Sequence, residues 1–246
     1  MVTVICGNSR FADITAILLD KDGTLTRSEP FLQHLARERA RLIEARVPGV
    51  GDAILTAFGA DENGINPAGL TAVGSPQENA IAAAAYIAET GRDWLECLQI
   101  AQQAFAEANR LMGEKGLEPQ LLPGVAEVLQ QMKQCGLKLA VVSSDIDEGI
   151  HKFLRRYQLA DSIDWVQGAQ DHLKKPDPQV LWTTCEKLGV RPEQTLMVGD
   201  SPGDFIMARE AKAAGSIGVS WGWSLAPNLK AADVAIARLD EIQLIS

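Results

Sequence analysis

The sequence predicts an α/β fold, in which a Rossmann-like, doubly wound parallel sheet carries an all-helical domain inserted after its first core strand. Two observations support this prediction. From residue 123 onward, short apolar runs of strand length alternate with amphipathic segments of helix length. This alternation is typical of a parallel sheet that is covered by helices on both faces. The preceding segment, 30–122, has mainly helical patterns and no comparable strand.

The first core strand is expected at 14–19, where an apolar run with β-branched residues ends at Asp20 and Asp22. Strand side chains alternate, so both acids can point into one small space at the carboxyl end of the strand. Two such carboxylates repel each other unless a cation lies between them, and their hard oxygen atoms suit Mg2+. We therefore expect Asp20 to be a nucleophile and Asp22 a general acid/base, with Mg2+ bridging them to a phosphate. The alternative is an ordinary polar turn, because Asp-Gly is a common turn dipeptide.

The inserted domain is expected to be a small helical bundle. Ser75 and Pro76 provide an N-cap and a first helical position, and the helix that follows is rich in alanine, which allows close packing. Residues 59–74 are expected to form a loop. The helices of the insertion are predicted at 31–43, 52–58, 79–89 and 93–113. The domains are therefore predicted to be a catalytic core of 1–29 and 123–246 and a helical domain of 30–122.

After the insertion, the core resumes with alternating helices and strands. The helices are predicted at 125–135, 148–157, 178–188 and 205–214. The strands are predicted at 137–142, 163–166, 195–199, 216–219 and 234–236. The first seven residues are expected to form a short extra strand or an arm. In open parallel sheets ligands bind at the carboxyl ends of the strands, and the remaining polar motifs follow such ends.

Three further motifs supply candidate site residues. Ser143 and Ser144 follow the strand at 137–142, and either hydroxyl can donate a hydrogen bond to phosphate. The alternative is that they form an N-cap or a turn before the next helix. Lys175 precedes a helix and can stabilise both the Asp20 carboxylate and the charge on a phosphoryl group, or belong to a solvated basic loop.

The last motif repeats the pattern of the first, because a buried strand again ends at acids. Asp200 lies directly at the strand end and can bind a metal ion. Asp204 can reach a metal-bound water or orient Lys175, or it can simply favour the start of the next helix, where an acid is stabilised by the helix dipole.

These motifs, in this order, resemble the four motifs of the haloacid dehalogenase superfamily. They are Asp20-Lys21-Asp22-Gly23-Thr24-Leu25, Ser143, Lys175-Pro176-Asp177-Pro178 and Gly199-Asp200-Ser201-Pro202-Gly203-Asp204. The helical insertion resembles the cap domain of that family. The nearest resemblance is to phosphoglycolate phosphatase-like members.

The resemblance implies specific roles for these residues. Asp20 would attack phosphorus and form an aspartyl-phosphate, and Asp22 would protonate the leaving alcohol and then activate water. The phosphoryl group would be bound by Ser143, or its neighbour Ser144, and by Lys175. Mg2+ would be held by the Asp20 side chain, the Asp22 main-chain carbonyl and Asp200, with support from Asp204.

Composition narrows the possible partners. The chain has 246 residues and a net charge of -9, which argues against nucleic acid and anionic membranes, since both attract a basic surface. The four cysteines lie far apart and form no C-x-x-C pair, as expected for reduced thiols in a cytoplasmic protein. The N-terminus lacks the basic segment and apolar core of a signal peptide. The expected partner is a small phosphorylated metabolite, and no feature indicates an oligomeric state.

The predicted function is therefore a Mg2+-dependent phosphatase that acts on a small phosphorylated metabolite through an aspartyl-phosphate. Two alternatives remain. A phosphoglucomutase-type phosphotransferase has the same core, but its phosphoenzyme must survive until a sugar phosphate arrives. A non-catalytic binding module predicts the loss of at least one motif residue, and every motif residue is present.

Overall fold

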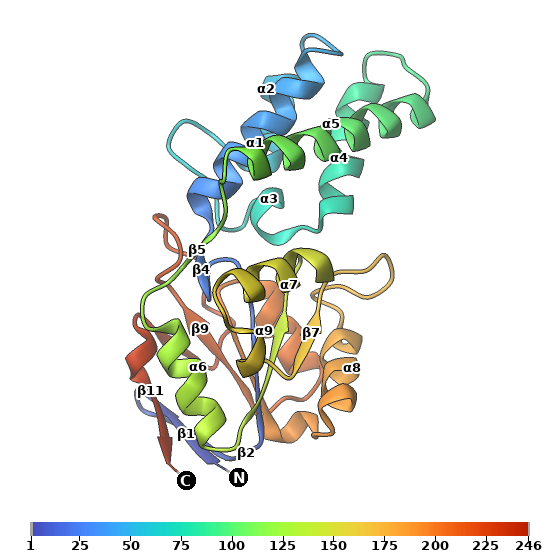
Figure 1. Cartoon of the computed structure of the whole chain (residues 1–246). Coiled ribbons are helices and arrows are strands. Elements are labelled where there is room, and N and C mark those ends of the chain that lie inside the picture. The colour runs from blue at the N-terminus through green and yellow to red at the C-terminus, as the bar shows by residue number, and fades with distance from the viewer. Residues whose placement is uncertain (1, 246) are drawn as a thin grey trace. The chain divides into compact units, whose positions relative to one another are not determined.

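The computed structural model describes residues 2–245, and the chain divides into two compact units (Figure 1). The core unit comprises Met1–Arg27 and Gln120–Ser246, and the helical unit comprises Ser28–Pro119. The chain therefore leaves the core unit shortly after its first acidic motif and returns to it before the second.

The core unit is built on a six-stranded parallel sheet with the strand order β10-β9-β8-β3-β6-β7. β3 lies between β6 and β8, and Leu19 of β3 is level with Val141 and Val198 of these neighbours. The ends of the three central strands therefore meet at one edge of the sheet, and the predicted α/β class is confirmed. The strands are β3 (Ala16–Leu19), β6 (Lys138–Val142), β7 (Trp165–Gln167), β8 (Thr195–Gly199), β9 (Gly215–Val219) and β10 (Val234–Ile236).

Helices cover both faces of this sheet, and their bounds are α6 (Val125–Gln134), α7 (Asp147–Arg156), α8 (Pro178–Leu188) and α9 (Pro202–Glu210). Side chains of β3 alternate between two apolar clusters. Leu19 packs in the cluster that includes Leu129 of α6 and Ile150 of α7. Leu18 packs in the cluster that includes Leu181 of α8 and residues of α9. Burial of both faces explains why the strands are continuous apolar runs.

α9 differs from the predicted range of 205–214. It begins at Pro202, because proline suits the first helical position and Ser201 precedes it as the N-cap. It ends at Glu210, and Lys212 then adopts a left-handed backbone conformation with φ of 58°, which a continuing helix excludes. The helix is therefore shorter and earlier than its apolar pattern indicates.

A second, three-stranded antiparallel sheet has the order β11-β1-β2, with β1 (Val2–Cys6), β2 (Ser9–Ile14) and β11 (Ile242–Ile245). The extra strand expected at the N-terminus is β1. The prediction of one strand over 14–19 was wrong at its start, because Ile14 belongs to β2 and Asp13 has a φ of 58°. β4 (Thr26–Arg27) and β5 (Gln120–Leu121) form a short antiparallel pair within the core unit.

The helical unit contains α1 (Glu29–Glu44), α2 (Gly51–Phe58), α3 (Leu70–Val73), α4 (Pro76–Ala88) and α5 (Trp94–Glu114). Ser75 caps α4 as predicted. Its hydroxyl accepts a hydrogen bond from Glu78 N at 3.2 Å, and the Glu78 carboxylate accepts one from Ser75 N at 2.8 Å. The segment 59–74, expected as a loop, contains the single-turn helix α3. Phe58 is fully buried and meets Phe105 edge-on, so this unit has its own core.

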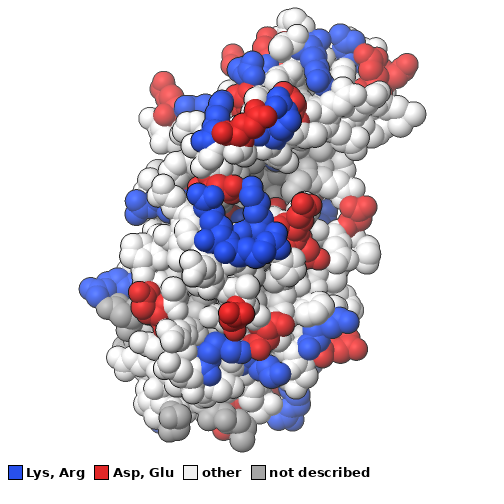
Figure 2. Space-filling model, in the orientation of Figure 1, with Lys and Arg blue, Asp and Glu red and all other residues white. Residues whose placement is uncertain are grey.

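α7 illustrates how an amphipathic helix meets both the sheet and water. Phe153 and Leu154 are buried, whereas Lys152, Arg155 and Arg156 are exposed. Figure 2 shows Lys and Arg side chains gathered over this helix. Arginines in the last turn also complement the negative end of the helix dipole.

Across residues 2–245, none of the helices combines the length and the apolar character that crossing a lipid bilayer requires.

Candidate active site

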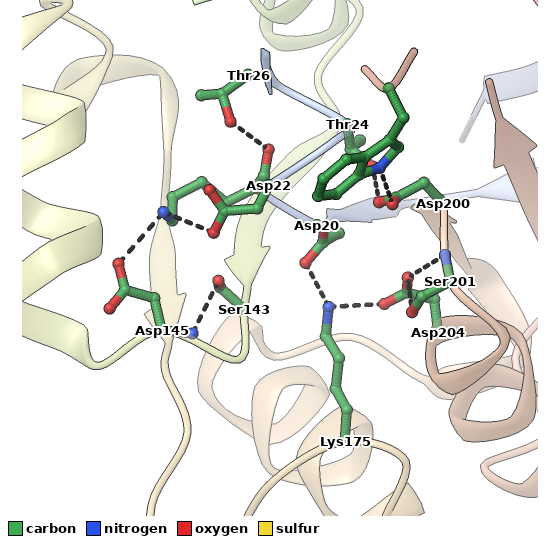
Figure 3. Close-up of polar contacts among 12 residues, drawn as sticks. Asp20, Asp22, Thr24, Thr26, Ser143, Asp145, Lys175, Asp200, Ser201 and Asp204 are labelled. Carbon is green, nitrogen blue, oxygen red and sulfur yellow. Dashed lines mark hydrogen bonds and ion pairs between the residues drawn. The ribbon is translucent and has the colours of Figure 1, made fainter. Parts of the chain in front are cut away.

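Three acids meet at the edge of the parallel sheet (Figure 3). Asp20 follows β3 and Asp200 follows β8, and Asp20 N donates to Val198 O at 2.9 Å, so the strand pairing extends to the first acid. Asp204 lies in the first turn of α9. All three side chains are buried, and one carboxylate oxygen from each lies within 4.8 Å of the others. We call these three residues the acidic cluster.

Lys175 joins two members of the acidic cluster. Its Nζ lies 2.6 Å from Asp20 Oδ1 and 2.6 Å from Asp204 Oδ1, and its side chain is only 7% exposed. Lys175 lies in the segment before α8, where Asp177 is the N-cap and accepts from Gln179 N at 2.8 Å. Lys175 is therefore buried and paired with acids, and the alternative that it belongs to a solvated basic loop is wrong.

Asp204 combines two of the roles considered for it. Its Oδ1 contacts Lys175, while its Oδ2 accepts from Ser201 N at 3.1 Å and from Ser201 Oγ at 2.8 Å. It therefore orients the lysine and also stabilises the start of α9. Gly199 makes this position possible, because a Cβ there would collide with the Asp204 carboxylate.

Asp200 is held by two donors that the sequence analysis did not assign. Thr24 Oγ1 donates to Asp200 Oδ1 at 3.0 Å, and the indole Nε1 of Trp223 donates to Asp200 Oδ2 at 2.6 Å. Thr24 belongs to the first motif, so its place in that motif was an available signal. Trp223 lies in the segment after β9, and no periodic pattern in the sequence links it to Asp200.

The electrostatics of the acidic cluster favour a cation. Burial, together with the neighbouring acids, raises the pKa of Asp20 from 3.8 to about 6, although Lys175 opposes the shift. Burial and the charges of Asp20 and Asp204 likewise raise the pKa of Asp200 well above its usual value. One ammonium group does not balance three buried carboxylates.

The donor set fits a metal ion. A buried group of three carboxylates provides hard oxygen ligands, and a divalent cation would remove the repulsion that raises these pKa values. Asp20, Asp200 and Asp204 are the residues that could hold it. The carboxylate of Asp22 is not part of this group within residues 2–245, so any contribution from Asp22 would come from its main chain.

Asp22 instead belongs to a neighbouring charge group. Its Oδ2 lies 2.7 Å from Nζ of Lys21, and the same ammonium lies 3.2 Å from Asp145 Oδ2 (Figure 3). Lys21 is buried, which by itself lowers its pKa, but the charges of Asp22 and Asp145 outweigh burial and raise it. Lysine is seldom buried, so this arrangement could not be expected from the residue pattern alone.

The two candidate serines lie at the end of β6. Ser143 is buried, and its Oγ accepts from Asp145 N at 3.1 Å, which leaves the hydroxyl proton for another acceptor. Neither serine is the N-cap of α7, because that position is Ile146, which makes no side-chain capping bond. The N-cap alternative for Ser143 and Ser144 is therefore wrong, whereas the bond from Asp145 N to Ser143 Oγ is the local turn contact that was expected as the other alternative. Their contact with phosphate stays a prediction.

The family model that describes the haloacid dehalogenase-like hydrolases matches residues 14–212 of the chain. The chain belongs to the haloacid dehalogenase-like hydrolase family. The match includes all four motifs and the helical unit, so the resemblance predicted from the motifs is confirmed.

Two curated relatives of this haloacid dehalogenase-like hydrolase are phosphoglycolate phosphatases. The protein of Psychrobacter arcticus is 31% identical over 136 residues, which are 55% of this chain and 58% of the relative, so that match spans little more than half of the relative. The protein of Escherichia coli (strain K12) is 30% identical over 223 residues, 88% of this chain and 85% of the relative.

A solved structure shares the fold. The crystal structure of a predicted phosphoglycolate phosphatase from Haemophilus somnus 129pt matches with a TM-score of 0.67 and 22% identity, over 93% of this chain and 96% of that chain. At this level of identity the likeness concerns the fold alone.

The haloacid dehalogenase-like hydrolase therefore gathers residues from distant motifs at one edge of its sheet. Asp20, Lys175, Asp200 and Asp204 lie together, and Asp22 and Ser143 belong to the adjoining segments of the same edge. Chemically, this arrangement places a buried carboxylate beside a fixed ammonium and beside oxygen atoms that could hold a metal ion.

Proposed function

We propose that this protein is a Mg2+-dependent phosphatase that hydrolyses a small phosphorylated metabolite through an aspartyl-phosphate on Asp20. The observation that carries the proposal is the contact of the Lys175 ammonium with Asp20, at 2.6 Å, beside the buried acidic cluster. The curated relatives are named phosphoglycolate phosphatases, which supports a small phosphorylated acid such as phosphoglycolate as the substrate.

In the first step an Asp20 carboxylate oxygen attacks phosphorus, and the bond between phosphorus and the alcohol oxygen breaks. The leaving oxygen takes a proton from Asp22. In the second step Asp22 removes a proton from water, whose oxygen attacks the aspartyl-phosphate. The bond between Asp20 and phosphorus breaks, and inorganic phosphate is released.

Charge neutralisation and positioning provide most of the catalysis in such a transfer. Lys175 and one of the two serine hydroxyls, Ser143 or Ser144, bind the phosphoryl oxygens. Asp20, Asp200 and the main-chain carbonyl of Asp22, with support from Asp204, would hold Mg2+, which would supply further positive charge near the phosphoryl group.

We also propose the domain organisation of the family: a catalytic core of 1–29 and 123–246 and a helical cap domain of 30–122. A cytoplasmic location is proposed with it, and the free cysteines support this location. They are Cys6, Cys97, Cys135 and Cys185. The net charge of -9 supports a small metabolite rather than a nucleic acid or an anionic membrane as the partner.

The proposal is tested by phosphate release from 4-nitrophenyl phosphate and phosphoglycolate with and without Mg2+. We expect turnover that depends on Mg2+ and that falls by at least about a thousandfold in D20N, because the amide is not a nucleophile. D161N changes an exposed aspartate of the same unit and serves as the matched control. Full activity in D20N would exclude Asp20 as the nucleophile.

A phosphoglucomutase-type transferase uses the same core chemistry, and one further measurement separates it. The phosphatase releases inorganic phosphate from a sugar phosphate or leaves the compound unchanged. The transferase converts one sugar phosphate isomer into another with little release of phosphate, which nuclear magnetic resonance of the products detects.

A further inference from the structure

Lys21 occupies an unusual position for a lysine. Its side chain is buried between two carboxylates, with Nζ at 2.7 Å from Asp22 Oδ2 and 3.2 Å from Asp145 Oδ2. A buried charge is costly unless it is paired, and here both partners are acids from segments that follow different strands. The ammonium therefore links the segment after β3 to the segment after β6.

The backbone around Lys21 is fixed independently of its side chain. The carbonyl of Lys21 accepts from Leu25 N at 2.9 Å, from Thr26 N at 3.1 Å and from Thr26 Oγ1 at 3.1 Å. These bonds are made by the main chain of position 21 and involve no atom of the lysine side chain. The side chain can therefore be changed while the turn that carries Asp22 keeps its main-chain support.

Asp145 is itself a rigid anchor. Its Oδ1 accepts from Ile146 N at 2.8 Å, its N–H donates to Ser143 Oγ at 3.1 Å and its carbonyl accepts from Ala169 N at 2.8 Å. Gly149 of α7 provides the space for its carboxylate, because a Cβ at that position would collide with it. The Lys21 ammonium is thus bound to a group that has little freedom to move.

We propose that Lys21, anchored by Asp145, is a positioning residue that holds Asp22 through Oδ2, so that the other carboxyl oxygen, Oδ1, carries the proton that is transferred to the leaving oxygen. The inference rests on the proposed function, in which Asp22 is the acid. Proton transfer requires the acid within hydrogen-bond distance of the leaving oxygen and in good alignment. A carboxyl group whose Oδ2 is bound to a fixed ammonium samples fewer orientations than one on a solvated side chain, so the proton on its other oxygen is more often aligned for transfer.

The test compares two substrates of nearly equal shape. 4-Nitrophenyl phosphate releases a weakly basic oxygen that leaves without a proton, whereas phenyl phosphate releases a more basic oxygen that benefits from one. Because kcat/KM reports the step in which the alcohol leaves, the ratio of the two kcat/KM values measures assistance by the acid. In K21M we expect kcat/KM to fall about tenfold more for phenyl phosphate than for 4-nitrophenyl phosphate.

Two variants of Asp residues support the comparison. D145N removes the anchor without changing Lys21 or Asp22, and we expect the ratio to move in the same direction by a smaller factor. D147N is the matched control, because Asp147 lies two residues away and bonds Gly168 N at 2.6 Å rather than the lysine. We expect D147N to leave the ratio within about twofold of the wild type, as befits a residue outside the site. If K21M does not fold, which its thermal melting shows, D145N decides.

The outcomes are distinct. An equal fall for both substrates, or no fall, in K21M and D145N overturns the positioning role while the proposed function stands, provided that the wild type is active and D20N is not. A wild type that releases phosphate from neither substrate overturns the proposed function and this inference with it.

Discussion

Adjacent side chains after β3 reach opposite faces of the sheet. Asp20 continues on the side of Leu18, where α8 and α9 pack, and it meets Lys175 ahead of α8. Lys21 continues on the side of α6 and α7, and it meets Asp145 ahead of α7. The alternation of a strand thus separates two groups of charges: three acids that share the Lys175 ammonium on one side, and two acids that share the Lys21 ammonium on the other.

The raised pKa of Asp20 has a consequence for stability. Burial raises it from 3.8 to about 6, so the folded state binds a proton more tightly than the unfolded state does. The free energy of unfolding of the metal-free protein therefore falls as pH rises from about 4 to about 6, and the loss persists at neutral pH. The side chain of D20N cannot ionise, so we expect its free energy of unfolding to be about 3 kcal/mol higher than that of the wild type at about pH 7.5.

Urea unfolding in the presence of a chelator measures this difference, and repeating it at about pH 5 tests the cause. The gain in D20N should shrink at the lower pH, because the wild-type carboxyl is then largely protonated. D161N changes an exposed aspartate and should alter the free energy of unfolding by less than about 0.5 kcal/mol. A D20N protein that is no more stable than the wild type at the higher pH would contradict the argument.

At the scale of elements, the strands and helices that have a clear local pattern of apolar residues could be predicted from the sequence. Buried strands are short apolar runs, so the succession of strands and helices along the core could be predicted, whereas the order of the strands within the sheet was not predicted. The antiparallel sheet did not follow, because β2 is largely exposed and β11 lies at the other end of the chain from its partner β1. Pairing between distant segments leaves no periodic signal in either one.

The candidate site likewise contains residues that could be predicted from the sequence and a contact that could not. Asp20 and Asp200 were predictable because acids directly follow apolar runs that end at the same edge of the sheet. The contact between Trp223 and Asp200 was not predictable, because the segment after β9 has no regular structure that would place an indole. Such contacts depend on how a loop returns over the sheet rather than on spacing.

The hydrogen bond between Trp223 and Asp200 should affect the affinity for Mg2+. The Trp223 indole donates to Asp200 at 2.6 Å and fixes the orientation of a proposed metal ligand. Groups that orient ligands in this way typically contribute 10- to 100-fold to metal affinity. W223F keeps the aromatic ring and removes the donor, so we expect its affinity for Mg2+ to fall by about tenfold. Calorimetric titration of Mg2+ into the protein without substrate measures this affinity.

W182F is the matched control for the change at Trp223. The Trp182 indole also donates a hydrogen bond, at 3.1 Å to Ala211 O, but it joins α8 to the end of α9 and touches no acid of the cluster. Its Mg2+ affinity should equal that of the wild type. Equal affinities in W223F and the wild type would show that Asp200 needs no such support.

At the scale of the molecule, the acidic cluster and Lys175 all belong to the core unit. The helical unit has separate stabilising contacts: Phe58 and Phe105 meet at 6.1 Å between ring centroids, and the Arg39 guanidinium lies 4.1 Å from the Phe105 centroid. Units with their own cores can in principle be destabilised separately. Metal binding should therefore respond to changes in the core unit and not to changes in the core of the helical unit.

F58A tests this separation. Phe58 is fully buried, so its removal leaves a cavity and should lower the free energy of unfolding by about 3–5 kcal/mol. The acidic cluster contains no residue of the helical unit, so the Mg2+ dissociation constant should stay within about twofold of the wild type when F58A is measured well below its melting temperature. Urea unfolding measures the free energy of unfolding, and calorimetric titration measures the Mg2+ dissociation constant.

L129A is the comparison, because it removes a buried side chain from the apolar cluster of the core unit that also contains Leu19. We expect L129A to weaken Mg2+ binding more than F58A does. Loss of Mg2+ binding in folded F58A would mean that the helical unit holds the acids in place, and the metal site would then be a property of the whole chain.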